Sequence, residues 1–388
     1  MASKWAACVL VSATLNLGCT FITSCPDPAG NEPSGGGGTN ATGGNGSGGG
    51  AVDPNAGGSP GDGDEWVNVT TNLASLVTGP TETCGNTYLL SAKPGEDLLI
   101  AGIGAHGLWA TSDGGETWTE LGTGAGSEPI PNIPTALVFD PDDADVFWEA
   151  GIYDSGLFKT EDHGETFKRL GDPRHNELVS VDFTDPKRNV ILAGGHEQRR
   201  MLYLSKDGGE TFEEIGSSLP SNAGVSSFPL VLDASTFLLG TQDFGGGITG
   251  IFRTTDAGES WEQVGEGGGV WQPLVASDGN IYWSGDMGGQ MLRSSDDGET
   301  WEEATPTGSE ISVAPIELPD GRIASVSRRY IVVSDDHADT WRPVSPPLPF
   351  RPRALAYSPE RKAFFISHET CADGEPTAVL RYDFDASE

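Results

Sequence analysis

The fold of this chain is decided by a short stretch that runs from Thr111 to Trp118 and reads TSDGGETW. The same pattern, Ser/Thr-x-Asp-x-Gly-x-Ser/Thr-Trp/Phe, returns as TEDHGETF from Thr160, SKDGGETF from Ser205, TTDAGESW from Thr254 and SSDDGETW from Ser294. A sixth copy, SDDHADTW from Ser334, has Ala338 where the others have glycine. Successive copies begin 49, 45, 49, 40 and 40 residues apart. A recurrence of about 40–50 residues is typical of propellers and related repeat arrays.

Each copy lies between two β-rich runs, such as GLWAT at 107–111 and WTELG at 118–122. We expect the aspartate to bond backbone amides of a hairpin turn, and the glycine to adopt the left-handed conformation that other residues resist. The aromatic residue is expected to pack between neighbouring sheets. Because one active site does not need six identical turns, we interpret the six aspartates as structural: Asp113, Asp162, Asp207, Asp256, Asp296 and Asp336.

Two further strand-like runs precede each copy, which gives four strands per unit, the blade of a β-propeller. After the sixth copy the chain offers three more runs, ALAYSP, KAFFIS and AVLRYDF, so the seventh unit lacks its fourth strand. Residues 66–70, WVNVT, fit that missing strand and have no unit of their own. The sequence therefore predicts an all-β, seven-bladed propeller over 64–388, with the last blade closed by the N-terminal strand, because closure removes exposed edges.

The repeated motif resembles the Asp-box (BNR) repeat of sialidases, xyloglucan-cleaving hydrolases, sortilin-type receptors and a photosystem II assembly factor. The resemblance implies the propeller fold but does not select a function. Sialidases grip a carboxylate with three arginines, one of them before the first repeat, whereas no arginine here precedes Arg169. The hydrolases use a cleft between two propellers, the assembly factor a basic patch, and the receptors a cysteine-rich module. None of these features is found in this sequence, and a typical sialidase is excluded.

The N-terminus reads as an export signal. Lys4 is followed by a largely apolar stretch, and Ile22-Thr23-Ser24-Cys25 resembles the lipobox of bacterial lipoproteins. We expect a signal peptide over 1–24, an acylated Cys25 and a flexible Gly/Ser/Asn-rich tether over 25–63. An ordinary cleaved signal is the alternative. The expected location is the bacterial cell envelope, either periplasmic or at the cell surface.

Five cysteines are present. Cys8 and Cys19 would leave with the signal and Cys25 would carry lipid, which leaves Cys84 and Cys371. An even pair in an exported protein suggests a disulfide, here between blades one and seven. Two free thiols are the alternative.

The formal charge is −35 and the isoelectric point is near 4.2. Nucleic acid and an anionic membrane surface are disfavoured as direct partners, because both would be repelled. We expect a monomer that meets the membrane only through its lipid. No cofactor motif is found, and a divalent metal is left open.

Candidate site residues gather in the second turns of the blades and in the links between blades, which share one face of a propeller. Loops on a rigid scaffold are where function concentrates, although polar turns are also simply solvated. The ligand-binding candidates are His106, Tyr153, His196, Arg199, Trp271, Arg328, Arg329, Arg353 and His368. The weaker catalytic candidates are the carboxylates Asp154, Glu197, Asp243, Asp286 and Glu369.

The leading functional hypothesis is a non-enzymatic propeller that binds a glycan, peptide or protein through this face. One alternative is a carbohydrate-active enzyme, a glycoside hydrolase or lyase that uses those carboxylates. The other is a structural subunit of an envelope complex.

Overall fold

A computed structural model describes residues 65–70, 72–77, 87–154, 156–243, 246–285, 289–305, 310–368 and 378–386. The predicted signal peptide and tether lie outside the described residues, as do Cys25, Cys84, Cys371, Asp286 and Glu369. Within the described part of the chain, no helix is long and apolar enough to cross a membrane.

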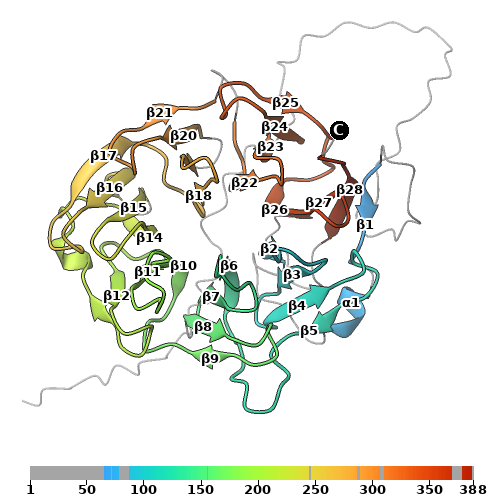
Figure 1. Ribbon diagram of the computed structural model, residues 1–388, viewed down its shortest axis with the longest axis horizontal. Helices are drawn as coiled ribbons and strands as arrows, with labels where there is room; N and C mark the ends of the chain where they lie inside the picture. Colours follow the sequence, from blue (N-terminus) through green and yellow to red (C-terminus); the bar gives the residue numbers. More distant parts are fainter. Residues whose placement is uncertain are drawn as a thin grey trace, which may run out of the picture. The chain divides into compact units, whose positions relative to one another are not determined.

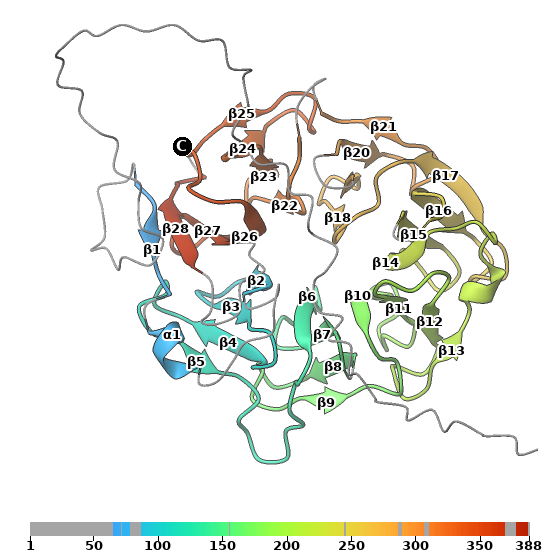
Figure 2. The ribbon, with the colours of Figure 1, turned by 180° about the vertical axis from the view of Figure 1, so that it is seen from behind.

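Seven sheets of four antiparallel strands form the blades of a propeller, as predicted (Figures 1 and 2). Blade 1 contains β2 (Leu89–Ala92), β3 (Leu99–Gly102), β4 (Leu108–Thr111) and β5 (Thr119–Glu120). Blade 2 contains β6 (Ile133–Phe139), β7 (Phe147–Ile152), β8 (Leu157–Thr160) and β9 (Lys168–Arg169). Blade 3 contains β10 (Asn176–Val181), β11 (Ile191–Gly195), β12 (Leu202–Ser205) and β13 (Glu213–Glu214). Blade 4 contains β14 (Val225–Val231), β15 (Phe237–Gln242), β16 (Gly250–Thr254) and β17 (Glu262–Glu266).

The remaining blades complete the ring. Blade 5 contains β18 (Leu274–Val275), β19 (Ile281–Ser284), β20 (Met291–Ser294) and β21 (Glu302–Glu303). Blade 6 contains β22 (Ile316–Glu317), β23 (Ile323–Ser327), β24 (Tyr330–Ser334) and β25 (Arg342–Pro343). Blade 7 contains β26 (Pro352–Ser358), β27 (Ala363–His368), β28 (Val379–Asp383) and the N-terminal β1 (Val67–Asn68). The described helices are α1 (Leu73–Leu76) and one 3-10 turn (Gly216–Ser218).

The ring is closed by strands from both ends of the chain. β1 pairs antiparallel with β28, with Val67 opposite Arg381 and Asn68 opposite Leu380 (Figure 2). The predicted closure of the last blade is therefore confirmed. It covers the edge of β28 that would otherwise be open to pairing with another chain.

The first strand of each blade lies nearest the ring centre, and the chain direction gives the propeller two distinct faces (Figure 1). The first turns and the six repeated turns form one face, which we call the repeat face. The second turns and the blade-to-blade links form the other, which we call the link face.

Each repeated turn is held by the same hydrogen bonds between its own residues. In blade 3 the Ser205 hydroxyl donates to Asp207 at 2.8 Å and accepts from the Gly209 amide at 2.9 Å. Asp207 also accepts from the Thr211 amide and hydroxyl at 2.9 and 2.6 Å. The other five copies repeat this network. The bonds from the Thr211 side chain are the main reason that the pKa of Asp207 falls to about 2.

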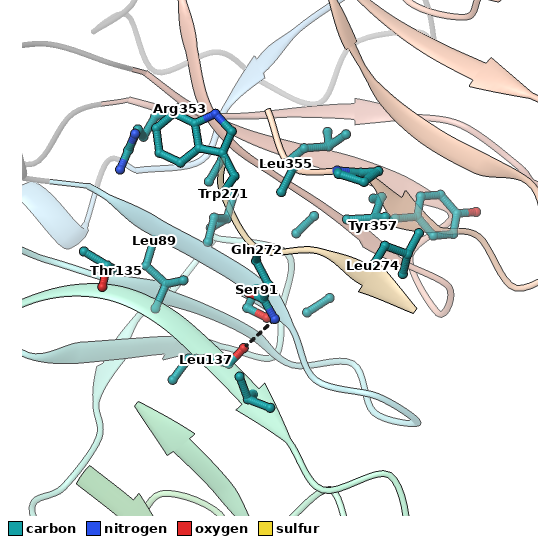
Figure 3. A pocket seen from close by; sticks show the side chains of 18 of the residues that line it. Leu89, Ser91, Thr135, Leu137, Trp271, Gln272, Leu274, Arg353, Leu355 and Tyr357 are labelled. Carbon is teal, nitrogen blue, oxygen red and sulfur yellow. Dashed lines mark hydrogen bonds between the residues drawn. The ribbon is translucent and has the colours of Figure 1, made fainter. Parts of the chain in front are cut away.

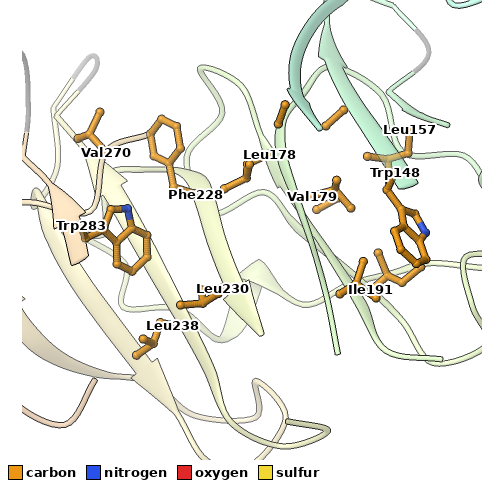
Figure 4. Packing of buried hydrophobic residues seen from close by; sticks show 14 of the residues in the cluster. Trp148, Leu157, Leu178, Val179, Ile191, Phe228, Leu230, Leu238, Val270 and Trp283 are labelled. Carbon is orange, nitrogen blue, oxygen red and sulfur yellow. The ribbon is translucent and has the colours of Figure 1, made fainter. Parts of the chain in front are cut away.

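Apolar side chains fill the spaces between neighbouring blades. One cluster runs from Trp148 in blade 2, past Val179 and Phe228, to Trp283 in blade 5 (Figure 4). The aromatic that ends a repeat contacts the preceding blade: the Trp118 indole N–H donates to the Val69 carbonyl at 2.9 Å, and the Trp341 indole N–H to that of Ala304 at 3.0 Å. Sheets joined in this way place the link-face loops on a rigid frame.

Candidate functional site

A cavity of about 460 Å³ lies among the inner strands at the ring centre. Its walls come from blades 1, 2, 5, 6 and 7, and both polar and apolar residues line it. The Gln272 side chain reaches across from the link before β18 and donates to the Leu137 carbonyl of β6 at 3.5 Å (Figure 3). The volume falls in the usual range for small-molecule sites.

Arg353 lies at this cavity beside Trp271 (Figure 3), and Tyr88 is its second aromatic neighbour. Its Cζ lies 3.3 Å from the centroid of the Tyr88 ring and 4.1 Å from that of Trp271. The three residues come from different blades: Tyr88 precedes β2, Trp271 precedes β18, and Arg353 is the second residue of β26. Two aromatic rings this close to the cation restrict the movement of the guanidinium.

A second group of side chains joins blades 2 and 3 on the link face. The buried carboxylate of Glu177, the second residue of β10, bonds His196 Nδ1, and Glu197 Oε1 lies 3.5 Å from His196 Nε2. Tyr153 completes the group, with its ring 5.4 Å from that of His196 between centroids.

The electrostatics of this group follow from burial and pairing. Burial opposes the charged form of His196, but the Glu177 carboxylate outweighs burial and raises the pKa of the imidazole. Burial would likewise raise the pKa of Glu177, yet the charge of His196 lowers it. The pair therefore favours imidazolium and carboxylate, the arrangement that a desolvated ion pair requires.

His175 has the opposite charge preference. Its ring lies 4.8 Å from that of His196 and at 90° to it, and burial together with that neighbour lowers the pKa of His175 to about 4. The Tyr153 backbone N–H donates to His175 Nδ1 at 2.9 Å, so in the neutral ring the proton must reside on Nε2. His175 is thus a fixed neutral hydrogen-bond donor at neutral pH.

Two groups of side chains have the spacing of metal ligands among the described residues. His175, His196 and Glu197 each place one ligand atom within 4.8 Å of the others. However, with Nδ1 of His175 accepting from Tyr153, its Nε2 is a donor and cannot ligate an ion without loss of that bond. On the repeat face, Glu96, Asp145 and His163 surround the buried ammonium of Lys93, which bonds Glu96 at 2.5 Å and His163 at 2.7 Å. In that second group the Lys93 ammonium occupies the position that a metal ion would take.

The other predicted site residues make contacts of their own, although the Asp154 carbonyl accepts from the His175 amide at 3.0 Å. Arg199 donates to the Ala223 carbonyl at 3.2 Å, and Arg329 donates to that of Leu348 at 2.7 Å. His368 stacks on Phe350 with ring centroids 4.5 Å apart. Asp154 lies 3.9 Å from Arg174. His106, Asp243 and Arg328 also lie in second turns, and Arg328 has a left-handed backbone.

Sequence reasoning missed two residues of the site, Glu177 and Tyr88. Both lie at or just before the start of an inner strand, where the pattern predicted core rather than site. The available signal was chemical: Glu177 is a charged residue in an otherwise uncharged inner strand, NELVSV. A charge in such a strand needs a partner when it is buried.

No family model and no curated protein matches this chain. Among solved structures it is similar to a streptogramin B lyase, with a TM-score of 0.57 and 12% identity over 82% of this chain and 96% of the lyase. It is also similar to the GH74 xyloglucanase from Xanthomonas campestris, with a TM-score of 0.54 and 18% identity over 83% of this chain. The extracellular domain assigned to a one-component system of B. thetaiotaomicron gives a TM-score of 0.55 and 11% identity over 84% of this chain.

These similarities define the protein as a β-propeller. The chain spans 54% of the xyloglucanase and 44% of the B. thetaiotaomicron protein. At such identities the likeness is one of fold, and the activities of those proteins do not transfer.

Proposed function

We propose that this protein is a ligand-binding propeller of the bacterial cell envelope, which takes a glycan, peptide or protein partner on its link face. The observation that carries the proposal is the Tyr88–Arg353–Trp271 stack at the central cavity. Side chains from blades 1, 5 and 7 meet there, and a binding site on a propeller needs such convergence. Half-exposed Tyr153 adds an aromatic surface on the same face.

Left-handed backbone occurs in turns of both faces, and on the link face it falls at residues of the candidate site. Tyr153, His175, Glu197 and Trp271 all have φ between 53 and 69°, a region that non-glycine residues seldom adopt. Such conformations cost of order 1–3 kcal/mol each and persist where the surroundings fix them, often at ligand sites.

The test compares the two faces. In a binding screen against neutral oligosaccharides, acidic oligosaccharides and peptides, Trp271→Ala should weaken binding with little change in melting temperature. Asp207→Ala on the repeat face should lower the melting temperature and leave binding intact. If Asp207→Ala lost binding while its melting temperature stayed normal, the ligand site would lie on the repeat face and the proposal would be wrong.

A carbohydrate-active enzyme is the second candidate, and the Glu177–His196–Glu197 group favours it. A histidine oriented by a buried carboxylate is suited to proton transfer. Incubation with a polysaccharide panel, read as new reducing ends or unsaturated products, tests this function. Activity that His196→Gln abolishes would support it, and an inert wild type would contradict it.

Anchoring completes the proposal. An acylated Cys25 followed by a tether over 25–63 would hold the propeller away from a bilayer. This placement suits a protein that meets its ligands in the envelope.

A further inference from the structure

The guanidinium of Arg353 is held between aromatic neighbours while its N–H donors are uncommitted. Its Cζ lies over the rings of Tyr88 and Trp271, but the guanidinium makes no hydrogen bond or ion pair to any residue that the structure describes. The five N–H donors of arginine lie in the guanidinium plane, so stacking leaves all of them available. Such a guanidinium can donate two parallel hydrogen bonds to a ligand oxyanion without first being ordered.

Other arginines of this chain differ in this respect. Arg188 donates to Asp140 and Asp142, and Arg329 bonds the Leu348 carbonyl. The N–H donors of these two arginines are engaged in hydrogen bonds within the protein. The uncommitted edge of Arg353 serves no contact within the described part of the chain, although it lies at a cavity.

The charge distribution singles out the same face. The whole chain carries a formal charge of −35, yet seven of its fifteen arginines fall in second turns, links or the strand ends beside them: Arg174, Arg199, Arg200, Arg328, Arg329, Arg351 and Arg353. No lysine of the described residues lies in those segments. The same segments also carry carboxylates, among them Asp154, Glu197 and Asp243, so the argument for an anion rests on arginine being the cation available at this face and on the free donors of Arg353.

The choice among anions rests on charge. Glu177 acts on Arg353 through space but is bonded to His196. The single positive charge of Arg353 can balance the single negative charge of a ligand carboxylate. A phosphate dianion would need a second cation. A carboxylate also matches the planar fork of arginine.

Aromatic and imidazole side chains on the same face point to a sugar as the carrier, and they are connected with Arg353 through the charge interaction of that arginine with His196. Half-exposed Tyr153 and the fixed Nε2–H of His175 offer a ring surface and a hydrogen-bond donor, both suited to a hydroxylated ring. We infer that Arg353 binds the carboxylate of an acidic saccharide, a uronic-acid residue, at the central cavity of the link face. This inference rests on the proposed binding function and specifies its ligand class.

The experiment measures calorimetric binding of oligogalacturonate and oligoglucuronate against their carboxyl-reduced, neutral counterparts, using the full chain. The variants are Arg353→Met, Arg353→Lys and the matched control Arg342→Met, which removes an exposed arginine of the outer strand β25, away from the link-face turns. We expect the wild type to prefer an acidic probe, and Arg353→Met to lose roughly 10- to 100-fold in affinity for it, the usual effect of a charged hydrogen bond. Arg353→Lys keeps the charge without the planar fork of donors and should fall between the two, and Arg342→Met should bind as the wild type does.

The outcomes separate the inference from the function on which it rests. If neutral probes bind as well as acidic ones, and only Trp271→Ala weakens them, the link face binds glycans but the carboxylate inference is wrong. Equal affinity of wild type and Arg353→Met for the acidic probes overturns it too. If acidic peptides bind through Arg353 and no saccharide does, the saccharide assignment is wrong. If no probe binds, both the inference and glycan binding fall. Melting temperatures of the variants check that each is folded.

Discussion

A buried carboxyl group in blade 2 gives the sharpest test of the structure. Glu149 in β7 is fully buried, its Oε2 accepts from the Asn132 side chain at 3.4 Å, and its Oε1 has no partner within the described residues. Burial raises the pKa of this carboxyl well above its ordinary value of 4.5, and the Asn132 hydrogen bond offsets only part of the rise. The folded protein therefore holds a proton that the unfolded chain releases.

The sign and size of the effect follow from linkage. Below pH 4.5 the carboxyl is protonated in both states, so its contribution is fully present there and declines as pH rises toward the folded pKa. Across that window the free energy of unfolding should fall by about 1.4 kcal/mol per pH unit. Glu149→Gln keeps the shape and cannot ionise, so within that window its stability relative to the wild type should rise by about 1.4 kcal/mol for each pH unit.

Denaturant unfolding at a series of pH values measures this difference. Glu120→Gln, an exposed change in β5, is the matched control and should follow the wild type at every pH. If the stabilities of Glu149→Gln and the wild type differ by the same amount at every pH, the difference reports only how the amide packs. That result would show that Glu149 is not a buried neutral acid.

Four further predictions concern closure, packing, anchoring and cross-linking. Deleting residues 64–70 should uncover the edge of β28 and cause aggregation, and a monomeric deletion variant with cooperative melting would contradict this. Trp118→Ala should lower the free energy of unfolding by about 3–5 kcal/mol, because the ring is buried and bonds the Val69 carbonyl, whereas a loss under about 1 kcal/mol would refute that role. Cys25→Ser should move the protein from the membrane fraction to the soluble fraction, and unchanged fractionation would speak against lipidation. A non-reducing peptide map should contain a Cys84–Cys371 peptide, whose reduction should cost about 2–5 kcal/mol; free thiols at both positions would exclude it.

The architecture was predictable because each blade is specified locally. Six turns carry their own hydroxyl–aspartate hydrogen bonds, and those bonds join residues two and four positions apart. Even the worn copy keeps the network, with Ala338 held in the left-handed conformation at φ 72°. The count of seven then required only that residues 66–70 be matched to a missing strand.

The candidate site was predictable only as a face. Turn and link positions placed Tyr153, His196, Trp271 and Arg353 on one side, but no local rule says which of them meet. Arg353 and Tyr88 are brought together by closure of the ring, and the sequence separation between them carries no signal of it. Glu177 was missed because its position in a strand was interpreted as core. Its charge indicated otherwise, because a buried carboxylate needs a partner.

The two faces differ in how their polar groups are satisfied, and this difference argues for a division of labour. On the repeat face the aspartates accept hydrogen bonds from residues of their own turns, so these carboxylates need no ligand to satisfy them. On the link face the Arg353 donors make no bond within the described chain, and His196 Nε2 is buried without a hydrogen bond, with the Glu197 carboxylate 3.5 Å away. Uncommitted polar groups of this kind lower the stability of the free protein unless water or a ligand supplies the missing bonds. A fold stabilised by six self-contained turns can tolerate that cost, which is why recognition is expected on the face where the sequence repeats least.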